Sequence, residues 1–172
     1  MTTVQVDTAE RMEQLGRTLA AHLRAGDVVV LHGSLGAGKT TFSRGIGEGL
    51  QVEGVVQSPT FVVARTHSRQ DSTLPALVHI DAYRLNHSEE LVDLDVDYDH
   101  SIVLIEWGRP HVEHVAAEWL DVDISAESFA QDDSPDFADN RPRVVTLSGH
   151  TRSGEPSTRF ADALEALDDF GH

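Results

Sequence analysis

The chain has 172 residues, enough for one domain with a sizeable core, and its 40% hydrophobic and 24% charged residues are typical of a globular protein. Thirteen Lys and Arg against 29 Asp and Glu leave a formal net charge of −16, which argues against a chain that grips RNA or DNA by itself. The lack of cysteine excludes a disulfide scaffold, and without a leader pattern or an apolar run of roughly 20 residues we expect a cytoplasmic protein that contacts no membrane.

A helix and a strand are the first predicted elements. Apolar residues recur near helical spacing over residues 7–23, which predicts an amphipathic helix. We expect Asp7 to cap this helix, with Glu10 completing a capping box. The β-branched run at Val28–His32 then predicts a buried strand.

A glycine-rich loop, Gly33–Gly38, leads from this strand to a second helix, expected from Thr40 to about Leu50. Each of the three glycines inside the helix, at positions 45, 47 and 49, weakens it by about 1 kcal/mol relative to alanine. We expect these glycines to permit close packing against a neighbouring element.

Strands dominate the middle of the chain. They are expected at Phe61–Thr66 and Leu77–Asp81, and because the gap between them is too short for a crossover helix, they should pair antiparallel. Farther along we expect a buried strand at Ile102–Ile105, a short helix at Pro110–Ala117, and strands at Leu120–Ile124 and Arg143–Leu147.

The C-terminal part contains two segments of different character. Residues 125–140 are polar and acidic, so we expect a mobile insertion there. The tail, residues 150–172, has apolar side chains at helical spacing between residues 158 and 167, which indicates a docking helix. Together the elements predict a single domain over residues 1–172, a three-layer α/β fold with a mixed, mostly parallel central sheet.

Residues 33–40, Gly-Ser-Leu-Gly-Ala-Gly-Lys-Thr, match the pattern G-x-x-x-x-G-K-[ST] of phosphate-binding loops, between a predicted strand and a predicted helix. In that setting the backbone N–H groups and the helix N-terminus bind phosphate oxygens. Lys39 reaches the β- and γ-phosphates, the Thr40 hydroxyl binds Mg²⁺, and Thr41 touches the α-phosphate. The expected nucleotide-binding residues are Gly33, Ser34, Leu35, Gly36, Ala37, Gly38, Lys39, Thr40 and Thr41.

The chain uses lysine only once, at Lys39, and arginine at the other twelve cationic positions. Because a compact ammonium and a planar guanidinium bind phosphate in different ways, this placement favours a phosphate site over an ordinary turn with a solvated lysine. We therefore expect the fold of the P-loop NTPases.

Two acidic residues, Asp81 and Glu106, end predicted buried strands. Enzymes with this loop need an acid there to hold Mg²⁺ or orient water. Glu106 is the expected metal ligand because its strand is more completely apolar, although solvated strand-end carboxylates remain an alternative for both. The alternating aspartates at 93–99 do not fit an EF-hand, and His79 with Asp81 does not fit a zinc motif.

With these segments placed, the chain resembles the TsaE family (formerly YjeE), bacterial P-loop ATPases of tRNA threonylcarbamoyladenosine synthesis. The resemblance covers about residues 12–124, and weakly 143–149. Its landmarks are Gly26–Val29, Leu35–Phe42, Ser58–Phe61, His79–Leu85 and Ile105–Trp107. The phosphate loop is generic, whereas S-P-T-F, H-x-D-x-Y-R-L and E-W in this order are specific.

The resemblance implies roles for several residues. Ser58–Phe61, which contains Thr60, would be a switch-like loop near the γ-phosphate. Asp81 would act in catalysis close to the attacking water, and Glu106 would bind Mg²⁺. Trp107 would lie close to the nucleotide, with a packed aromatic at a strand end as an equal alternative. The expected catalytic residues are Lys39, Asp81 and Glu106, and the expected metal ligands are Thr40 and Glu106.

The resemblance also implies ATP and Mg²⁺ as cofactors and the TsaD and TsaB proteins as partners. TsaD transfers the threonylcarbamoyl group to adenosine 37 of tRNA, and ATP hydrolysis by TsaE supports repeated turnover. The tRNA would be held chiefly by the partners, which suits the charge of −16, and no DNA is expected. Ser34 departs from the usual Asp of the family, and residues 125–140 and the tail exceed its usual length.

Other functions fit parts of the pattern. A small-molecule kinase is the main alternative, with Arg65, Arg69 or Arg84 as a lid arginine. A GTPase is disfavoured because the chain has no N-K-x-D motif. In a non-catalytic scaffold gated by nucleotide, Asp81→Ala and Glu106→Ala would leave function intact while the loss of the lysine would abolish it.

Overall fold

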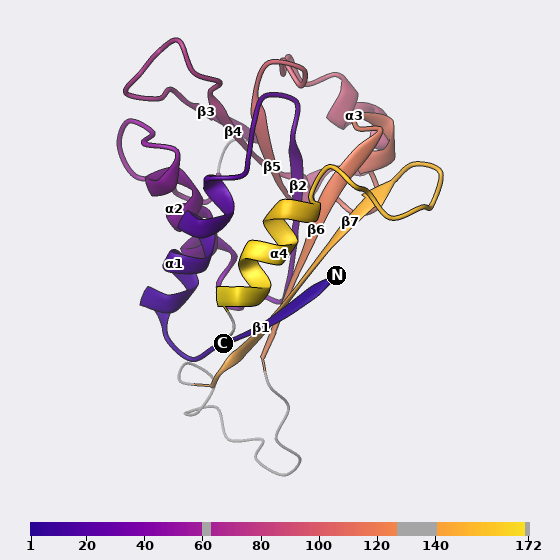
Figure 1. The fold of residues 1–172 in the computed structure, drawn as a ribbon. Coiled ribbons are helices and arrows are strands. Elements are labelled where there is room, and N and C mark those ends of the chain that lie inside the picture. Colours follow the sequence, from indigo (N-terminus) through magenta and orange to yellow (C-terminus); the bar gives the residue numbers. More distant parts are fainter. Residues whose placement is uncertain (60–62, 127–140, 171–172) are drawn as a thin grey trace.

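The computed structural model describes residues 1–59, 63–126 and 141–170. Its central element is a seven-stranded sheet with the order β1-β7-β6-β2-β5-β4-β3 (Figure 1). The strands are β1 (Thr2–Val6), β2 (Val28–His32), β3 (Ala64–His67), β4 (Leu77–Asp81), β5 (Ile102–Glu106), β6 (Glu118–Ala126) and β7 (Arg143–Thr151). The helices are α1 (Ala9–Ala20), α2 (Lys39–Gly49), α3 (Ser88–Val92) and α4 (Ala161–Phe170), with short 3₁₀ turns η1 (Ala82–Arg84) and η2 (Val112–His114).

The sheet is mixed, as expected. The neighbours β6, β2, β5 and β4 are parallel, whereas β3 runs antiparallel to β4 and β7 antiparallel to β6. Because β1 is in turn antiparallel to β7, five of the seven strands in the described part of the chain run in one direction. The antiparallel pairing of β3 with β4 confirms the argument from the short connection between them.

Helices cover the two faces of the sheet, which confirms the three-layer prediction. On one face α1, α2 and α4 pack over a core that includes Leu15, Phe42 and Leu167 (Figure 1). On the other face a smaller cluster joins Leu91 of α3 to Trp119 of β6 and to the apolar side chains of β4 and β5. The strands supply side chains to both clusters, because successive side chains of a strand point to opposite faces of the sheet. None of the helices in the described ranges is long and apolar enough to span a bilayer.

Two of the three glycines of α2, Gly45 and Gly49, allow it to pack directly on α1, as expected, whereas Gly47 packs against Val52 and Val56. An ideal Cβ at Gly45 would lie 2.0 Å from the carbonyl oxygen of Glu13, and one at Gly16 would lie 2.4 Å from that of Phe42. No heavier side chain fits at either contact without displacing the backbone. The two helices therefore meet backbone to backbone.

The cap of α1 differs from the prediction. The helix begins at Ala9, and its N-cap is Thr8, whose hydroxyl accepts a hydrogen bond from the backbone N–H of Arg11 at 3.1 Å. Asp7 is not the cap because the chain is still extended at Thr8, two residues after Val6 leaves the sheet. The helix also ends earlier than predicted, at Ala20.

The strands β6 and β7 are longer than predicted because they pair with each other residue by residue from Glu118 to Ala126. Ser125 and Ala126, which we assigned to the insertion, are therefore the end of β6. The rest of that insertion, residues 127–140, lies outside the described residues. The predicted helix at 110–117 reduces to the turn η2, since the chain joins β6 at Glu118.

Two elements were not predicted, β1 and α3. β1 is a short edge strand whose only described sheet partner is β7, more than 130 residues away in the chain. Its local signal, Val4 and Val6 alternating with exposed polar residues, is only five residues long. The tail does form a helix, α4, although it runs from Ala161 to Phe170 rather than over 158–167. Just before it, Arg159 donates to the buried carboxylate of Asp27 and ties the tail to the start of β2.

Candidate functional site

The site is built at the edge of the sheet where β2, β4 and β5 end side by side. The register places Leu31 opposite Glu106 and Glu106 opposite Asp81, so the two strand-end acids are neighbours. The loop Gly33–Gly38 follows β2 directly, and α2 begins at Lys39. In parallel α/β sheets ligands bind at this carboxyl edge.

A cavity of about 640 Å³ opens at this edge, within the range of small-molecule sites. It brings together most of the residues expected from the sequence. The lining residues are Leu35, Gly36, Gly38, Lys39, Thr40, Thr41, Ser58, Asp81, Tyr83, Glu106 and Trp107.

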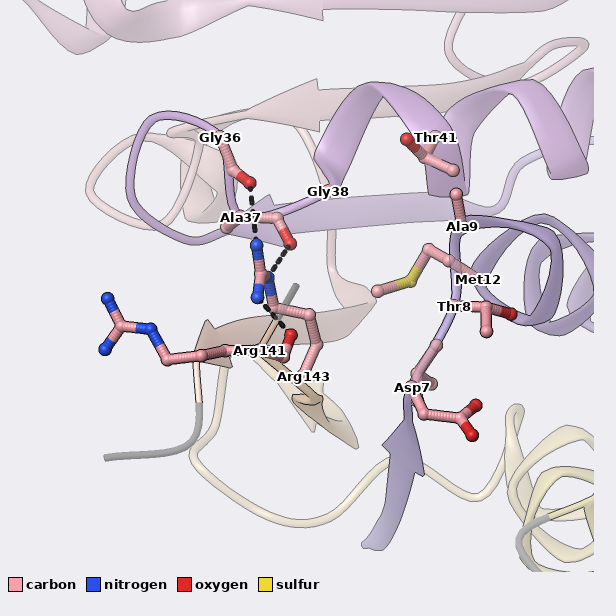
Figure 2. A pocket seen from close by; sticks show the side chains of 11 residues that line it. Asp7, Thr8, Ala9, Met12, Gly36, Ala37, Gly38, Thr41, Arg141 and Arg143 are labelled. Atoms are coloured by element: carbon pink, nitrogen blue, oxygen red, sulfur yellow. Dashed lines mark hydrogen bonds between the residues drawn. The ribbon is translucent and has the colours of Figure 1, made fainter. Parts of the chain in front are cut away.

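Among the residues that the structure describes, three expected nucleotide-binding residues do not line the cavity. Gly33 and Ser34 instead offer their carbonyl oxygens to Lys39. Ala37 lines a second cavity, between the loop, the start of α1 and β7 (Figure 2). Thr60 lies outside the described residues.

Lys39 is held in the loop although it is a charged residue with only 7% of its surface exposed. Its Nζ donates to the carbonyl oxygens of Gly33 at 2.8 Å and Ser34 at 3.1 Å. Gly38, the N-cap of α2, has a left-handed φ of 116° and supplies no side-chain cap, so the first N–H groups of the helix lack this partner. An ammonium and open N–H groups at one point form an anion site.

Glu106 is anchored by His79, a residue that the sequence argument set aside. His79 is completely buried, and its Nε2 lies 2.9 Å from Oε1 of Glu106, which is 4% exposed. Because an ionised carboxylate only accepts, Nε2 carries the hydrogen. Within the described residues the Nδ1 atom has no hydrogen-bond partner. The signal in the sequence was the spacing, since His79 and Asp81 are two apart on β4 and therefore share a face.

Asp81 both lines the cavity and organises the turn after β4. Its Oδ1 accepts the backbone N–H of Tyr83 at 3.0 Å, which caps η1. The Tyr83 side chain is 71% exposed and reaches the rim of the cavity. One carboxylate oxygen of Asp81 is thus committed to the backbone, which fixes the direction of the other.

Trp107 occupies a strained backbone position, with φ of 60°. Such a conformation costs a bulky residue on the order of 1–3 kcal/mol and is concentrated at functional sites. The Trp107 N–H donates to the Leu31 carbonyl at 3.1 Å, and the ring centroid lies 4.8 Å from Nζ of Lys39. The ring centroid of Trp107 also lies 5.5 Å from that of Tyr83 and 6.4 Å from that of His32, the latter in an edge-to-face arrangement. Trp107 therefore packs against both rings and forms part of the cavity wall.

The oxygen donors at the cavity fit a magnesium ion bound together with phosphate. Thr40, Asp81 and Glu106 line the same space. Among residues 1–59, 63–126 and 141–170, no cluster of three or more His, Cys, Asp or Glu could enclose a metal by itself. Mg²⁺ is commonly held by one or two protein oxygens, water and substrate phosphates, and it does not require such a cluster.

Comparisons with known proteins give one consistent result. A family model described as "Threonylcarbamoyl adenosine biosynthesis protein TsaE" matches residues 6–134. The "tRNA threonylcarbamoyladenosine biosynthesis protein TsaE" of Streptomyces coelicolor is 53% identical over 112 residues, which cover 63% of this chain and 75% of that protein. The protein of the same name from Bacillus subtilis is 38% identical over 117 residues, 67% of this chain and 72% of that one.

The fold has a solved neighbour as well. The crystal structure of Bacillus subtilis YdiB matches with a TM-score of 0.67 and 26% sequence identity, covering 99% of this chain and 95% of that chain. The likeness supports the expected α/β fold of the P-loop NTPases, and it extends over nearly the whole length of both molecules.

Proposed function

We propose that this chain, which belongs to the TsaE family of threonylcarbamoyl adenosine biosynthesis proteins, binds and hydrolyses Mg·ATP in support of tRNA modification. Family membership gives the role in tRNA threonylcarbamoyladenosine biosynthesis. The observation that carries the ATPase proposal is the geometry around Lys39. Its Nζ is held at the phosphate loop, and the adjacent acids Asp81 and Glu106 line the same cavity.

In this proposal the loop binds the phosphates of ATP. The N–H groups at the start of α2 contact the phosphate oxygens, and Lys39 turns from the carbonyls of Gly33 and Ser34 to the β- and γ-phosphates. The ammonium then stabilises the negative charge that develops as the terminal phosphoryl group leaves. Thr41, two residues after Lys39 in α2, contacts the α-phosphate.

Thr40 and Glu106 are the residues that would hold Mg²⁺, which when bound neutralises charge on the β- and γ-phosphates. His79 keeps Glu106 in place by holding Oε1, and the second carboxylate oxygen remains for the ion or its water. A carboxylate that is anchored by a buried partner does not need to be ordered when the nucleotide binds.

Asp81 orients the water that attacks the γ-phosphorus. Its Oδ1 is bound to the N–H of Tyr83, so the other oxygen is the acceptor for a water hydrogen. The water adds to phosphorus, the bond to the β–γ bridging oxygen breaks, and ADP and inorganic phosphate leave. Ser58, which lines the cavity, would lie near the γ-phosphate.

The partners in this proposal are the TsaD and TsaB proteins, which hold the tRNA. A chain of net charge −16 has little affinity for tRNA by itself, because it offers few cations to the phosphates. Its ATP turnover would instead reset the partner complex between cycles of modification.

The test is reconstitution with TsaD, TsaB, tRNA and the precursor of the threonylcarbamoyl group. We expect wild-type protein to support several modified tRNAs per complex with matching ATP turnover, and Lys39→Ala to support neither. Arg44→Ala, an exposed position on α2 outside the cavity, is the matched control. Multiple turnovers with Lys39→Ala, or a phosphorylated metabolite in place of released phosphate, would contradict the proposal.

A further inference from the structure

The turn that follows β5 is attached to two other strands. In the sheet, β2 lies between β5 and β6 (Figure 1). The backbone N–H of Trp107, the first residue after β5, donates to the carbonyl oxygen of Leu31 in β2 at 3.1 Å. Two residues later, the side chain of Arg109 reaches the carboxylates of β6. The turn is therefore held at two points, one on β2 and one on β6.

Arg109 binds two carboxylates with one guanidinium. Its Nε donates to Oδ2 of Asp121 at 3.0 Å, and its Nη2 donates to Oδ2 of Asp123 at 3.4 Å. The two aspartates are two residues apart on β6 and share one face, which lets the planar guanidinium span both. His32 of β2 is opposite Asp123 in the register, and its ring lies edge-on to that of Trp107. The face that carries the ion pairs is therefore the face on which Trp107 packs.

Asp121 is a firm anchor for Arg109 because it is buried, with only 7% of its surface exposed. Within the described part of the chain, its Oδ1 has no hydrogen-bond partner, and Nε2 of His150 lies 3.9 Å from its Oδ2. A buried carboxylate requires a charged, hydrogen-bonded partner. The Asp121 carboxylate therefore holds the half-exposed guanidinium of Arg109 in place.

Trp107 needs such support because its backbone is strained, with φ of 60°. A bulky residue keeps this conformation only where the surrounding structure holds it. Gly108, between Trp107 and Arg109, has no room for a side chain, since an ideal Cβ there would lie 2.5 Å from Cγ2 of Ile105. The bond to Leu31 restrains the strained residue from its N-terminal side, and Arg109 restrains it from its C-terminal side.

The place of the Trp107 ring matters to the phosphate site through Lys39. The ring centroid lies 4.8 Å from Nζ, within the range of a cation–π interaction. The carbonyl oxygens of Gly33 and Ser34 hold the same ammonium group. The ring therefore adds a contact that limits where the ammonium can move, and it keeps this place only while the backbone of Trp107 keeps its conformation.

We propose that Arg109 is a positioning residue of the phosphate site. Through its ion pair with Asp121 it keeps Trp107 in the left-handed conformation, with the ring beside Lys39. The proposal rests on the proposed function, because it takes Lys39 to bind the phosphates of ATP. Arg109 does not line the cavity, so it acts on the site through Trp107.

The test combines tryptophan fluorescence of the unliganded protein with calorimetry of Mg·ATP binding. The chain has two tryptophans, so Trp119→Phe leaves Trp107 as the single reporter and keeps an aromatic ring at the buried position. Arg109→Ala and Arg44→Ala are made in this background. Arg44, exposed on α2 and outside the cavity, is the matched control for the loss of one arginine.

We expect Arg109→Ala to move the Trp107 emission to longer wavelength, to increase its quenching by acrylamide and to weaken Mg·ATP binding by about fivefold to thirtyfold, as for a partly desolvated cation–π contact. Arg44→Ala should change none of these. When Trp107→Ala has already removed the ring, adding Arg109→Ala should weaken Mg·ATP binding by less than about twofold, because no ring remains to be positioned.

Unchanged emission or unchanged ATP affinity in Arg109→Ala would overturn the inference, and so would an equal loss of affinity with and without the Trp107 ring. A wild-type chain that did not bind Mg·ATP would instead overturn the proposed function. The fluorescence of the unliganded protein would still test the placement of Trp107, so the two failures are distinct.

Should Arg109→Ala fail to fold because Asp121 keeps a buried charge without its partner, Arg109→Ala combined with Asp121→Asn removes both charges. The same red shift and loss of affinity are expected. Arg109→Lys, which offers one compact donor in place of the planar guanidinium, should fall between wild type and Arg109→Ala. Wild-type emission or wild-type affinity in the double variant would overturn the inference.

Discussion

Replacement of His79 by phenylalanine should release Glu106 while leaving the core filled. The imidazole is completely buried, and its Nε2 donates to Oε1 of Glu106 at 2.9 Å. Phenylalanine has a similar shape, so the change removes the hydrogen bond with little cavity formation. A hydrogen bond to a charged group contributes about 1.5–3 kcal/mol, and the carboxylate that loses it stays buried.

We therefore expect His79→Phe to lower the free energy of unfolding by about 1.5–3 kcal/mol. For a chain of this length, each kcal/mol corresponds to about 2–4 °C in Tm, so the midpoint should fall by roughly 3–12 °C. His79→Gln should recover part of the loss, because the glutamine amide can reach the place of the imidazole Nε2 and donate to the same carboxylate.

The assay is urea unfolding followed by circular dichroism on wild-type, His79→Phe, Glu106→Ala and the double variant. If the two residues act as a pair, the double variant loses less than the two single variants combined, by about 1 kcal/mol or more. Losses that add within about 0.5 kcal/mol would refute the coupling. A Mg²⁺ titration of ATP binding provides the functional readout, in which His79→Phe should require more Mg²⁺.

Three further results are expected. Gly45→Ala should destabilise the protein by about 1–3 kcal/mol in urea unfolding, because its Cβ would lie 2.0 Å from the Glu13 carbonyl oxygen. This loss should outweigh the better helix propensity of alanine. A stabilised variant would contradict this packing. Burial lowers the pKa of His67 from 6.5, so the unfolded chain binds a proton at this residue more readily than the folded chain. The free energy of unfolding should therefore fall as the pH drops below about 6.5, and it should fall less steeply in His67→Gln. Equal slopes in the two proteins would show that another group is responsible. Arg143→Ala should weaken Mg·tripolyphosphate binding by about threefold to tenfold in calorimetry, because the Ala37 carbonyl loses a charge-assisted donor; unchanged affinity would mean that the loop keeps its form unaided.

The phosphate loop and the strand-end acids could be predicted because their signals are local. The loop is eight consecutive residues between a strand and a helix, and the ends of β4 and β5 are visible as apolar runs that stop at Asp81 and Glu106. Parallel strands bring their carboxyl ends to one edge, so the sequence alone indicated that these acids lie near Lys39. The sheet, its mixed direction and the family followed from the same local patterns.

What required the tertiary structure was every contact between segments distant in the chain. β1 exists as a strand through β7, the cap of α1 moved to Thr8 because β1 precedes it, and the wall of the second cavity combines Met12 with Arg143. These features depend on which surfaces meet after the chain has folded. A five-residue strand has too short an alternation to identify it, and a single arginine has no pattern at all, so packing and hydrogen bonding with a remote partner decide their places.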